Sequence, residues 1–302
     1  MEKEIRTIEE FLNEMFIIQS KVEKEYNHWK ATYHTGLAFR GQSNKDYELL
    51  PAIGRDRRSC CHISILDQER NLIEMAKFKL PHIFNSSLLP IDMLALLQHY
   101  GIPTRLLDVT SNPLVSLYFA SFDDNVDGEV LVFRYNDSDR TNYPVYNAIA
   151  ESYKFSITTH KRLSDFYQNV ISQSYFDEQR VSISEDTSDQ GGRWIEENFR
   201  SLLFVHASEQ LERQRLQQGF YILFPNKIIE QGGCLCFEKL ISPIEKSNEQ
   251  ILERVIIKKE SKKEIRKKLE FLGISEATLF ADNIDIVCKN IVEQCKKIGF
   301  QN

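Results

Sequence analysis

The strongest constraint on the fold is the alternation of short apolar segments with amphipathic ones along the whole chain. Residues 7–30 carry apolar side chains at spacings of three and four, which predicts a helix with one buried face. Residues 128–134, Gly-Glu-Val-Leu-Val-Phe-Arg, predict a strand. Further helices are predicted at 66–84, 91–100, 161–176, 260–272 and from Pro113 onward, and further strands at 36–41, 201–207, 219–224, 233–240 and 252–258, with a surface loop at 182–193. We therefore predict an α+β fold, a mixed central sheet with flanking helices, in one domain spanning residues 1–302.

Charge and hydropathy exclude several classes of protein. The 302 residues include 38 Lys and Arg against 44 Asp and Glu, a formal net charge of −6, which disfavours a broad nucleic-acid-binding face. No stretch of about 18 apolar residues occurs, so no membrane span is predicted. The N-terminal segment lacks the apolar core of a secretion signal, and we therefore expect a cytoplasmic location.

The cysteines and several missing motifs narrow the chemistry. Six cysteines occur without any Cys-x-x-Cys pair, so no metal site is predicted; they are Cys60, Cys61, Cys234, Cys236, Cys288 and Cys295. The pattern around Cys234 and Cys236 indicates a buried strand. The sequence has no P-loop, no Gly-x-Gly-x-x-Gly, no Gly-x-Ser-x-Gly and no His-Glu-x-x-His. ATP binding, dinucleotide binding and acyl transfer by those devices are therefore not predicted.

The first unusual segment is Phe39-Arg-Gly-Gln-Ser43. An arginine at the end of an apolar strand, followed by glycine, is expected to place a guanidinium at a sheet edge beside exposed backbone. Such an arginine can bind a phosphate or a carboxylate with two hydrogen bonds. The alternative is that Arg40 forms an internal salt bridge that holds the glycine turn.

The second segment, residues 98–113, gathers several polar residue types near the predicted ends of helices and strands. Binding sites are commonly built from such clusters. His99 is a candidate acid–base group, because imidazole exchanges protons near neutral pH. The alternative is that His99 caps a helix end and that Asp108 pairs internally with Arg105.

The third segment, residues 213–221, places Gln217 and Gln218 before Gly219 and an apolar strand. A glutamine amide donates and accepts hydrogen bonds but cannot act as a base, so it suits ribose hydroxyls or an amide ligand. The alternative is that the two glutamines only complete the first backbone hydrogen bonds of the strand.

Taken together, the three segments resemble the FRG-domain family over roughly residues 36–225, with the helix at 7–30 before this core and an extension at 226–302. The matching residues are Phe39-Arg-Gly-Gln42, Leu50-Pro51, Arg55, Glu69, Gln98-His-Tyr-Gly-Ile-Pro-Thr-Arg-Leu-Leu-Asp108, Thr110, Pro113, Leu117-Tyr-Phe-Ala120, Arg213, Gln217, Gly219 and Tyr221, and Ile274 to Phe280 resembles the usual ending of the family. Val109 stands where the family usually has tryptophan, and Ser116 where it has alanine. Members of this family occur in bacteria and phages, some of them in toxin or phage-defence settings.

The same segments are more distantly similar to ADP-ribosyltransferases. This similarity implies an ADP-ribosyltransferase-like fold that takes NAD. It implies that the catalytic residues are Arg40, His99, Asp108 and Gln217, and that the NAD-binding residues are Arg40, Gly41, Gln42, Thr104, Arg105, Thr110, Ser111, Gln217 and Gly219. Those enzymes carry a catalytic glutamate near the position of Gln217, and none occurs there. Losing such a charged group costs about 2.7–4 kcal/mol of transition-state stabilisation, unless Asp108, Glu69 or Glu212 supplies the carboxylate.

Two functions from different classes therefore remain open. The first is an NAD-dependent ADP-ribosyltransferase or NAD glycohydrolase that acts as a bacterial toxin or phage-defence effector on a protein target. The second is a non-catalytic module of the same fold that senses a nucleotide or binds a regulatory protein. A third reading, a nuclease or other phosphoryl-transfer enzyme, rests only on the clustered Arg, His and Asp residues, because no paired carboxylates at metal-ligand spacing occur.

Overall fold

The structure, a computed structural model, describes residues 2–29, 35–56, 63–85, 87–136, 143–154, 161–166, 196, 201–207 and 212–281. The predicted loop at 182–193, residues 167–176 of the helix predicted at 161–176, and Cys60, Cys61, Cys288 and Cys295 lie outside these residues. The prediction of one domain over residues 1–302 stays a prediction.

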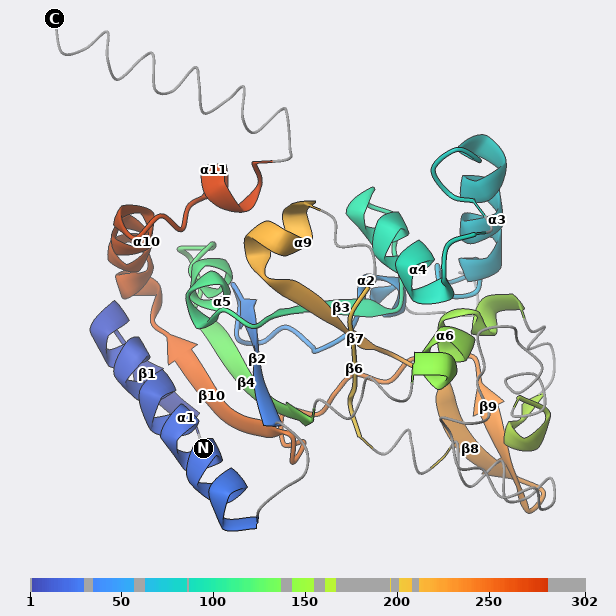
Figure 1. The fold of residues 1–302 in the computed structure, drawn as a ribbon, viewed down its shortest axis with the longest axis horizontal. Helices are drawn as coiled ribbons and strands as arrows, with labels where there is room; N and C mark the ends of the chain where they lie inside the picture. Colours follow the sequence, from blue (N-terminus) through green and yellow to red (C-terminus); the bar gives the residue numbers. More distant parts are fainter. Residues whose placement is uncertain are drawn as a thin grey trace, which may run out of the picture.

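A seven-stranded sheet forms the centre of the protein, in the order β1–β10–β4–β2–β3–β7–β6 (Figure 1). Its strands are β1 (Glu2–Ile5), β2 (Thr35–Gln42), β3 (Leu106–Thr110), β4 (Gly128–Asn136), β6 (Leu203–Val205), β7 (Gly219–Leu223) and β10 (Ile251–Ile257). Strands β1 and β10 pair in parallel and the other neighbours pair antiparallel. The sheet is therefore mixed, which confirms the predicted α+β class.

A smaller sheet lies beside the central one, with strands in the order β5–β9–β8. These strands are β5 (Lys161–Arg162), β8 (Lys227–Gln231) and β9 (Cys234–Glu238). Within β9, Cys236 is buried and Cys234 is partly exposed, so the predicted strand is confirmed and only one of its two cysteines is fully enclosed. The sequence analysis missed β8, whose residues are mostly exposed or half-buried.

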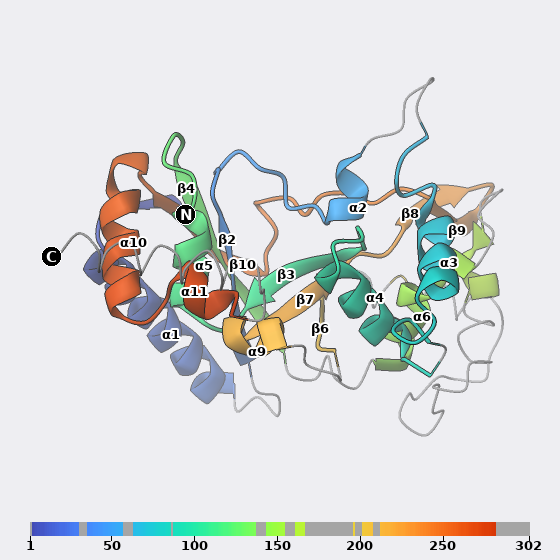
Figure 2. The ribbon, with the colours of Figure 1, turned by 90° about the horizontal axis from the view of Figure 1, so that it is seen from above.

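Helices gather at the two ends of the central sheet (Figures 1 and 2). At the β1 and β10 end lie α1 (Ile8–Trp29), α5 (Pro113–Ala120), α10 (Lys262–Phe271) and α11 (Glu276–Leu279). At the other end, near β8 and β9, lie α3 (Glu69–Lys79), α4 (Pro90–His99) and α6 (Tyr143–Ala150). Two further helices are short: α2 (Ala52–Arg55) lies between β2 and α3, and α9 (Glu212–Gln217) lies between β6 and β7. Each end has its own apolar cluster, because each helix buries one face against the sheet.

A third apolar cluster covers part of the sheet and explains how β3 presents polar side chains. Leu107 and Val109 of β3 belong to this cluster, together with Phe133 and Phe220. Successive side chains of a strand point to opposite faces. Asp108, between Leu107 and Val109, therefore points away from this cluster, and its side chain is exposed.

Most predicted elements agree with the structure in type and differ mainly in extent. The helix predicted at 161–176 is wrong at its start, because Lys161–Arg162 pair with β9 as strand β5. The predicted helices at 7–30, 66–84, 91–100 and 260–272 correspond to α1, α3, α4 and α10, and α5 begins at Pro113 as predicted. Residues 104–110, for which the sequence favoured no element, contain β3. Helices α6 and α9 were missed. Among the described residues, no helix has both the length and the apolar character that crossing a bilayer requires.

Candidate functional site

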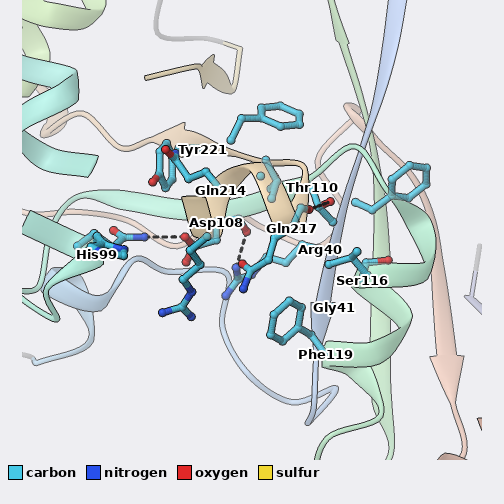
Figure 3. A pocket seen from close by; sticks show the side chains of 17 residues that line it. Arg40, Gly41, His99, Asp108, Thr110, Ser116, Phe119, Gln214, Gln217 and Tyr221 are labelled. Atoms are coloured by element: carbon cyan, nitrogen blue, oxygen red, sulfur yellow. Dashed lines mark hydrogen bonds between the residues drawn. The ribbon is translucent and has the colours of Figure 1, made fainter. Parts of the chain in front are cut away.

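A cleft of about 330 Å³ opens where the central strands β2, β3 and β7 meet α4, α5 and α9 (Figure 3). The register explains the position, because Phe39 of β2 pairs with Thr110 of β3 and Thr110 pairs with Gly219 of β7. The lining residues are Phe39, Arg40, Gly41, Gln98, His99, Asp108, Val109, Thr110, Val115, Ser116, Phe119, Arg213, Gln214, Gln217, Gly219, Phe220 and Tyr221. The three sequence segments therefore meet in one place.

Arg40 reaches into the gap where β2 and β3 separate. The sequence analysis expected the Arg40 guanidinium at a sheet edge. Strand β2 instead lies inside the sheet, between β4 and β3. It pairs with β3 through Phe39 and Thr110 alone, and beyond this pair the Arg40 guanidinium donates from Nη1 to the backbone carbonyl of Asp108 at 2.5 Å. The opening therefore comes from strand divergence.

The charge of Arg40 is not neutralised by a carboxylate contact within the described part of the chain, so the predicted alternative of an internal salt bridge is wrong there. Its Nε is buried and has no hydrogen-bond partner. Burial lowers the pKa of Arg40 to about 10, against the charge of Asp108, and the like charge of Arg55 lowers it further. The group stays protonated at neutral pH and has hydrogen-bonding capacity left for an anion.

Asp108 presents a carboxylate to the cleft, oriented by a chain of hydrogen bonds. Its Oδ1 accepts from Gln98 Nε2 at 2.8 Å, and Gln98 Oε1 accepts from the Thr104 hydroxyl at 2.6 Å. The alternative pairing of Asp108 with Arg105 is wrong, because Arg105 pairs with Glu69. Thr104 is itself buried and does not line the cleft, so it acts on the site through Gln98.

Tyr221 lies directly opposite Asp108 on the neighbouring strand β7 and lines the same cleft. Burial raises the pKa of Tyr221 far above its ordinary value, and the nearby negative charge of Asp108 raises it further. The phenol therefore stays neutral and can donate a hydrogen bond. The sequence analysis included Tyr221 in the motif but not among the site residues. The signal that could have found it is the cross-strand register, since opposite residues share a face of the sheet.

Thr110 and Gln217 line the cleft, and each also makes hydrogen bonds within the fold. The Thr110 hydroxyl donates to the Gln217 carbonyl at 2.6 Å and accepts from the Asn112 backbone amide at 3.0 Å. The Gln217 amide nitrogen donates to the carbonyl of Leu279 in α11 at 3.1 Å. The Gln217 side chain therefore bonds to α11, and not to the first backbone groups of β7 as the predicted alternative required.

The C-terminal helix α11 supports one wall of the cleft. The guanidinium of Arg213 lies over the ring of Phe280 at 4.7 Å, and Phe280 packs edge-on against Phe119 at 6.1 Å between ring centroids. Arg213 and Phe119 both line the cleft. Phe280 follows α11 directly, so the ending of the chain that resembles the family ending is part of the site's support.

His99 is the last residue of α4, and its ring packs edge-on against Tyr100 at 5.0 Å between ring centroids. It lines the cleft beside Gln98. It stands at a helix end and also lines the cleft, so its two predicted roles, acid–base group and helix cap, both stay predictions.

The two glycines of the predicted site have different physical roles. A Cβ on Gly41 would lie 1.8 Å from the carbonyl oxygen of Ser116, so Gly41 is required for α5 to pack against β2. A Cβ on Gly219 would have its nearest neighbours at 3.7 Å, an ordinary contact. Packing therefore requires glycine at position 41. It does not require glycine at position 219, where a requirement for glycine would have to come from a ligand.

Three further predicted residues lie away from this cleft. Arg105 is almost fully buried and pairs with Glu69, so it holds the fold together. Ser111 lies past the end of β3, where its backbone amide donates to the carbonyl of Gln218 at 3.0 Å, and it lines a different cavity. The structure does not bring Arg105, Ser111 or Gln42 to the cleft.

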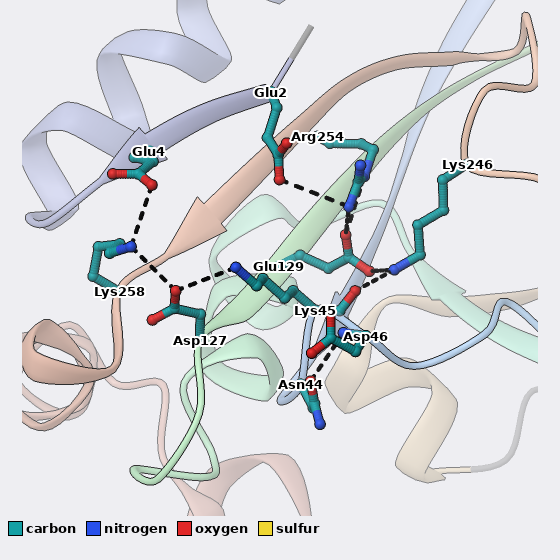
Figure 4. Close-up of polar contacts among 10 residues, drawn as sticks. All are labelled: Glu2, Glu4, Asn44, Lys45, Asp46, Asp127, Glu129, Lys246, Arg254 and Lys258. Atoms are coloured by element: carbon teal, nitrogen blue, oxygen red, sulfur yellow. Dashed lines mark hydrogen bonds and ion pairs between the residues drawn. The ribbon is translucent and has the colours of Figure 1, made fainter.

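Gln42 joins the buried charge network around Glu129 of the neighbouring strand β4, whose ion pairs are drawn in Figure 4. Its amide nitrogen, turned toward Glu129, donates to Glu129 Oε1 at 2.9 Å. Glu129 is fully buried and pairs with Lys246 and, at 2.9 Å, with Arg254. Gln42 is thus committed to this network on one side, although it also borders a second cleft next to Arg40.

Other lining residues were not foreseen as site residues, although several of them fall within the segments singled out. They are Phe39, Gln98, Val109, Val115, Ser116, Phe119, Arg213, Gln214, Phe220 and Tyr221. Most are apolar or neutral, and their place follows from the packing of α5 and α9 on the sheet. Among the described residues, no group of three His, Cys, Asp or Glu side chains is arranged to hold a metal ion.

Comparison with known proteins assigns the first two segments. The family model described as the FRG domain matches residues 35–128, from β2 through α5 to the start of β4. No curated protein and no solved structure matches the chain. The match contains Arg40, His99 and Asp108 and stops short of α9 and β7, so it is narrower than the resemblance over residues 36–225. The chain thus contains an FRG domain, and its cleft is built largely from residues of that domain.

Proposed function

We propose that the cleft binds a nucleotide of the NAD type and that the protein transfers its ADP-ribose group to an acceptor or to water. One observation carries the proposal. Arg40 brings a protonated guanidinium with a buried, unpartnered Nε to the same cleft in which Asp108 presents an exposed carboxylate. A cation for the phosphates and a separate carboxylate for the reacting sugar are the two charges that this chemistry requires.

Arg40 is assigned to the phosphates. A guanidinium binds phosphate through two parallel hydrogen bonds, and Arg40 has donors left after its contact with the Asp108 carbonyl. The cleft volume of about 330 Å³ lies within the range of small-molecule sites. Apolar walls from Phe39, Val115 and Phe119 are available for the planar parts of the ligand.

Asp108 is assigned to the charge that develops on the sugar. In the reaction the bond from ribose C1′ to the nicotinamide nitrogen breaks, and the electron pair leaves with nicotinamide. The positive charge on C1′ is stabilised by a carboxylate, and water or an acceptor group then bonds to C1′ and loses a proton. His99, which lines the same cleft, is the base that we assign to this proton.

The other two carboxylates considered for this role are placed elsewhere. Glu69 is buried and bound to Arg105, and Glu212 is exposed at the start of α9 and does not line the cleft. Asp108 is the carboxylate among the lining residues. The setting that we propose is a toxin or phage-defence effector, which the FRG domain suggests and which the experiment below does not require.

A second candidate function, nucleotide sensing without turnover, is favoured by Gln217. This residue stands near the place where ADP-ribosyltransferases carry their glutamate, and its amide is bonded to Leu279 of α11. A ligand that contacts Gln217 would therefore act directly on α11. In this reading the cleft binds the nucleotide and α11 reports it to a protein partner.

The experiment combines binding with turnover. NAD, ADP-ribose and nicotinamide are added to the wild-type protein, to Arg40→Gln and to Asp108→Asn, and both thermal shift and NAD consumption are measured. We expect Arg40→Gln to lose the shift, and Asp108→Asn to keep the shift and lose about 100–1000-fold in turnover. A wild-type protein that binds NAD without consuming it would favour sensing. A wild-type protein that shows no shift with any of the three would overturn both functions.

A further inference from the structure

A second cleft of about 450 Å³ adjoins the first and opens on the other side of Arg40. It is lined by Arg40, Gly41, Gln42, Ser43, Tyr47, Glu48, Leu50, Arg55, Phe119 and Phe122. Arg40, Gly41 and Phe119 line both clefts, so the two spaces meet at these residues. The guanidinium of Arg40 is therefore placed between two cavities rather than at the end of one.

Two guanidinium groups border this second cleft. Arg55 ends α2, donates from Nε to the carbonyl of Leu50 at 3.1 Å, and exposes the remainder of its side chain. Among the described residues, neither Arg55 nor Arg40 contacts a carboxylate at ion-pair distance. Two like charges that face one cavity repel each other, and a bound anion between them removes the repulsion.

Aromatic side chains complete the lining. Tyr47 and Phe122 are 52% and 59% exposed, which is high for residues of this size, and Phe119 stands at the junction of the two clefts. Exposed aromatic rings beside arginines are a common arrangement for stacking a nucleobase next to its phosphates.

We propose that Arg40 and Arg55 together clamp the phosphates of a dinucleotide-type ligand at the junction of the clefts, with a nucleobase bound in the second cleft against Phe122 and Tyr47. The sugar that reacts then lies in the first cleft beside Asp108. This inference rests on the proposed function for the nature of the first-cleft half of the ligand. It adds Arg55, Tyr47 and Phe122 as specificity residues and predicts that a ligand with only one ring and no second phosphate binds weakly.

The test uses titration calorimetry on the full chain with two probes, ADP-ribose and inorganic pyrophosphate. The variants are Arg55→Gln, Phe122→Leu and Arg40→Gln. Matched controls are Arg215→Gln, an exposed arginine of α9 outside both clefts, and Phe78→Leu, an 85% exposed phenylalanine of α3. Arg55 and Phe122 are exposed, so their variants are expected to fold, and thermal unfolding without ligand checks this.

We expect Arg55→Gln to weaken both probes by about ten- to a hundredfold, the loss of a charge-assisted contact. Phe122→Leu is expected to weaken ADP-ribose by about tenfold and to leave pyrophosphate unchanged, since only the base stacks. Both controls should bind like the wild type.

Three results would overturn the inference; the first leaves the proposed function standing, and the other two refute it as well. If Arg40→Gln abolishes ADP-ribose binding while Arg55→Gln and Phe122→Leu bind normally, the second cleft is not used and the proposed function stands. If the wild type binds pyrophosphate but not ADP-ribose, the base subsite and the NAD-type ligand both fail. If neither probe binds, both proposals fail. Binding through both arginines without NAD turnover would support the inference and refute only the transfer reaction.

Discussion

The guanidinium of Arg105 and the carboxylate of Glu69 form a two-pronged ion pair that is almost completely excluded from solvent. Arg105 Nε donates to Glu69 Oε1 at 2.7 Å and Nη2 donates to Oε2 at 2.5 Å, with side-chain exposures of 1% and 2%. Arg105 Nη1 also donates to the carbonyl of Phe224 at 3.0 Å. The pair thus ties α3 to the start of β3 and to the end of β7, and so holds the strands that carry Asp108 and Tyr221 in place.

Glu69→Gln is expected to destabilise the protein by about 3–5 kcal/mol, because it leaves a buried guanidinium without its counter-charge. The control is Glu74→Gln, which removes a pair between Lys77 and a 53% exposed carboxylate on the same helix and should cost less than about 1 kcal/mol. Urea unfolding of both variants measures the difference. Equal midpoints for the two would show that the buried pair contributes no more than an exposed one.

Gly41→Ala is expected to destabilise the protein by about 1–3 kcal/mol or more, because the new Cβ would lie 1.8 Å from the Ser116 carbonyl and α5 would have to move. Gly219→Ala is the matched control, since its Cβ would find its nearest atoms at 3.7 Å. Thermal unfolding separates the two. A ligand affinity that drops in a stable Gly219→Ala protein would show that this glycine serves the ligand, and a stable Gly41→Ala protein would contradict our account of the β2–α5 contact.

The affinity for ADP-ribose is expected to depend on pH through Arg40. Because burial lowers the pKa of Arg40 to about 10, the group is charged below that value and neutral above it. Phosphate binding should therefore stay constant between about pH 7 and pH 9 and fall as the pH rises through about 10, by up to about tenfold per pH unit. Titration across this range measures it. An affinity that is unchanged at a pH well above 10, in protein that is still folded, would remove Arg40 from the phosphate site.

Gln98→Leu is expected to reduce turnover while leaving NAD affinity nearly unchanged. The substitution breaks the hydrogen bond that orients Asp108 and does not touch Arg40. We expect about a tenfold loss in kcat, the scale of one lost hydrogen bond, and rescue by Gln98→Glu is not expected because it would place a second carboxylate beside Asp108. A change in KM alone would mean that Gln98 binds substrate rather than positioning Asp108.

Local pattern was sufficient for much of the secondary structure and for locating the site segments. Apolar spacing identified α1, α4 and β4, and proline marked the start of α5, because these signals depend on residues close in sequence. The polar segments around Arg40, Asp108 and Gln217 were singled out for the same reason, and all three of these residues line the cleft. Short or partly exposed elements such as β8 and α9 carry too few apolar positions for such a pattern to appear.

The ion-pair and hydrogen-bond partners of the polar side chains could not be predicted from local sequence pattern. Within one short segment, Arg105 and Asp108 looked equally suited to a ligand, yet one is buried against Glu69 and the other is exposed in the cleft. The two side chains differ because Arg105 precedes β3 and meets Glu69 of α3, whereas Asp108 lies on the face of β3 that lines the cleft. Tyr221 lies in the first cleft because of strand register, and Arg55 borders the second cleft because of the path of α2.

The amino-acid sequence alone therefore determines the longer, strongly periodic helices and strands, the α+β class and the three polar segments, since these follow from periodicity and residue type within a few turns of chain. Tertiary packing determines which polar groups are consumed inside the fold and which stay available to a ligand. The reason is physical: a charged side chain bonds to whichever partner lies closest in space, and the partners of Arg40 and Arg105 are 36 to 119 residues away along the chain.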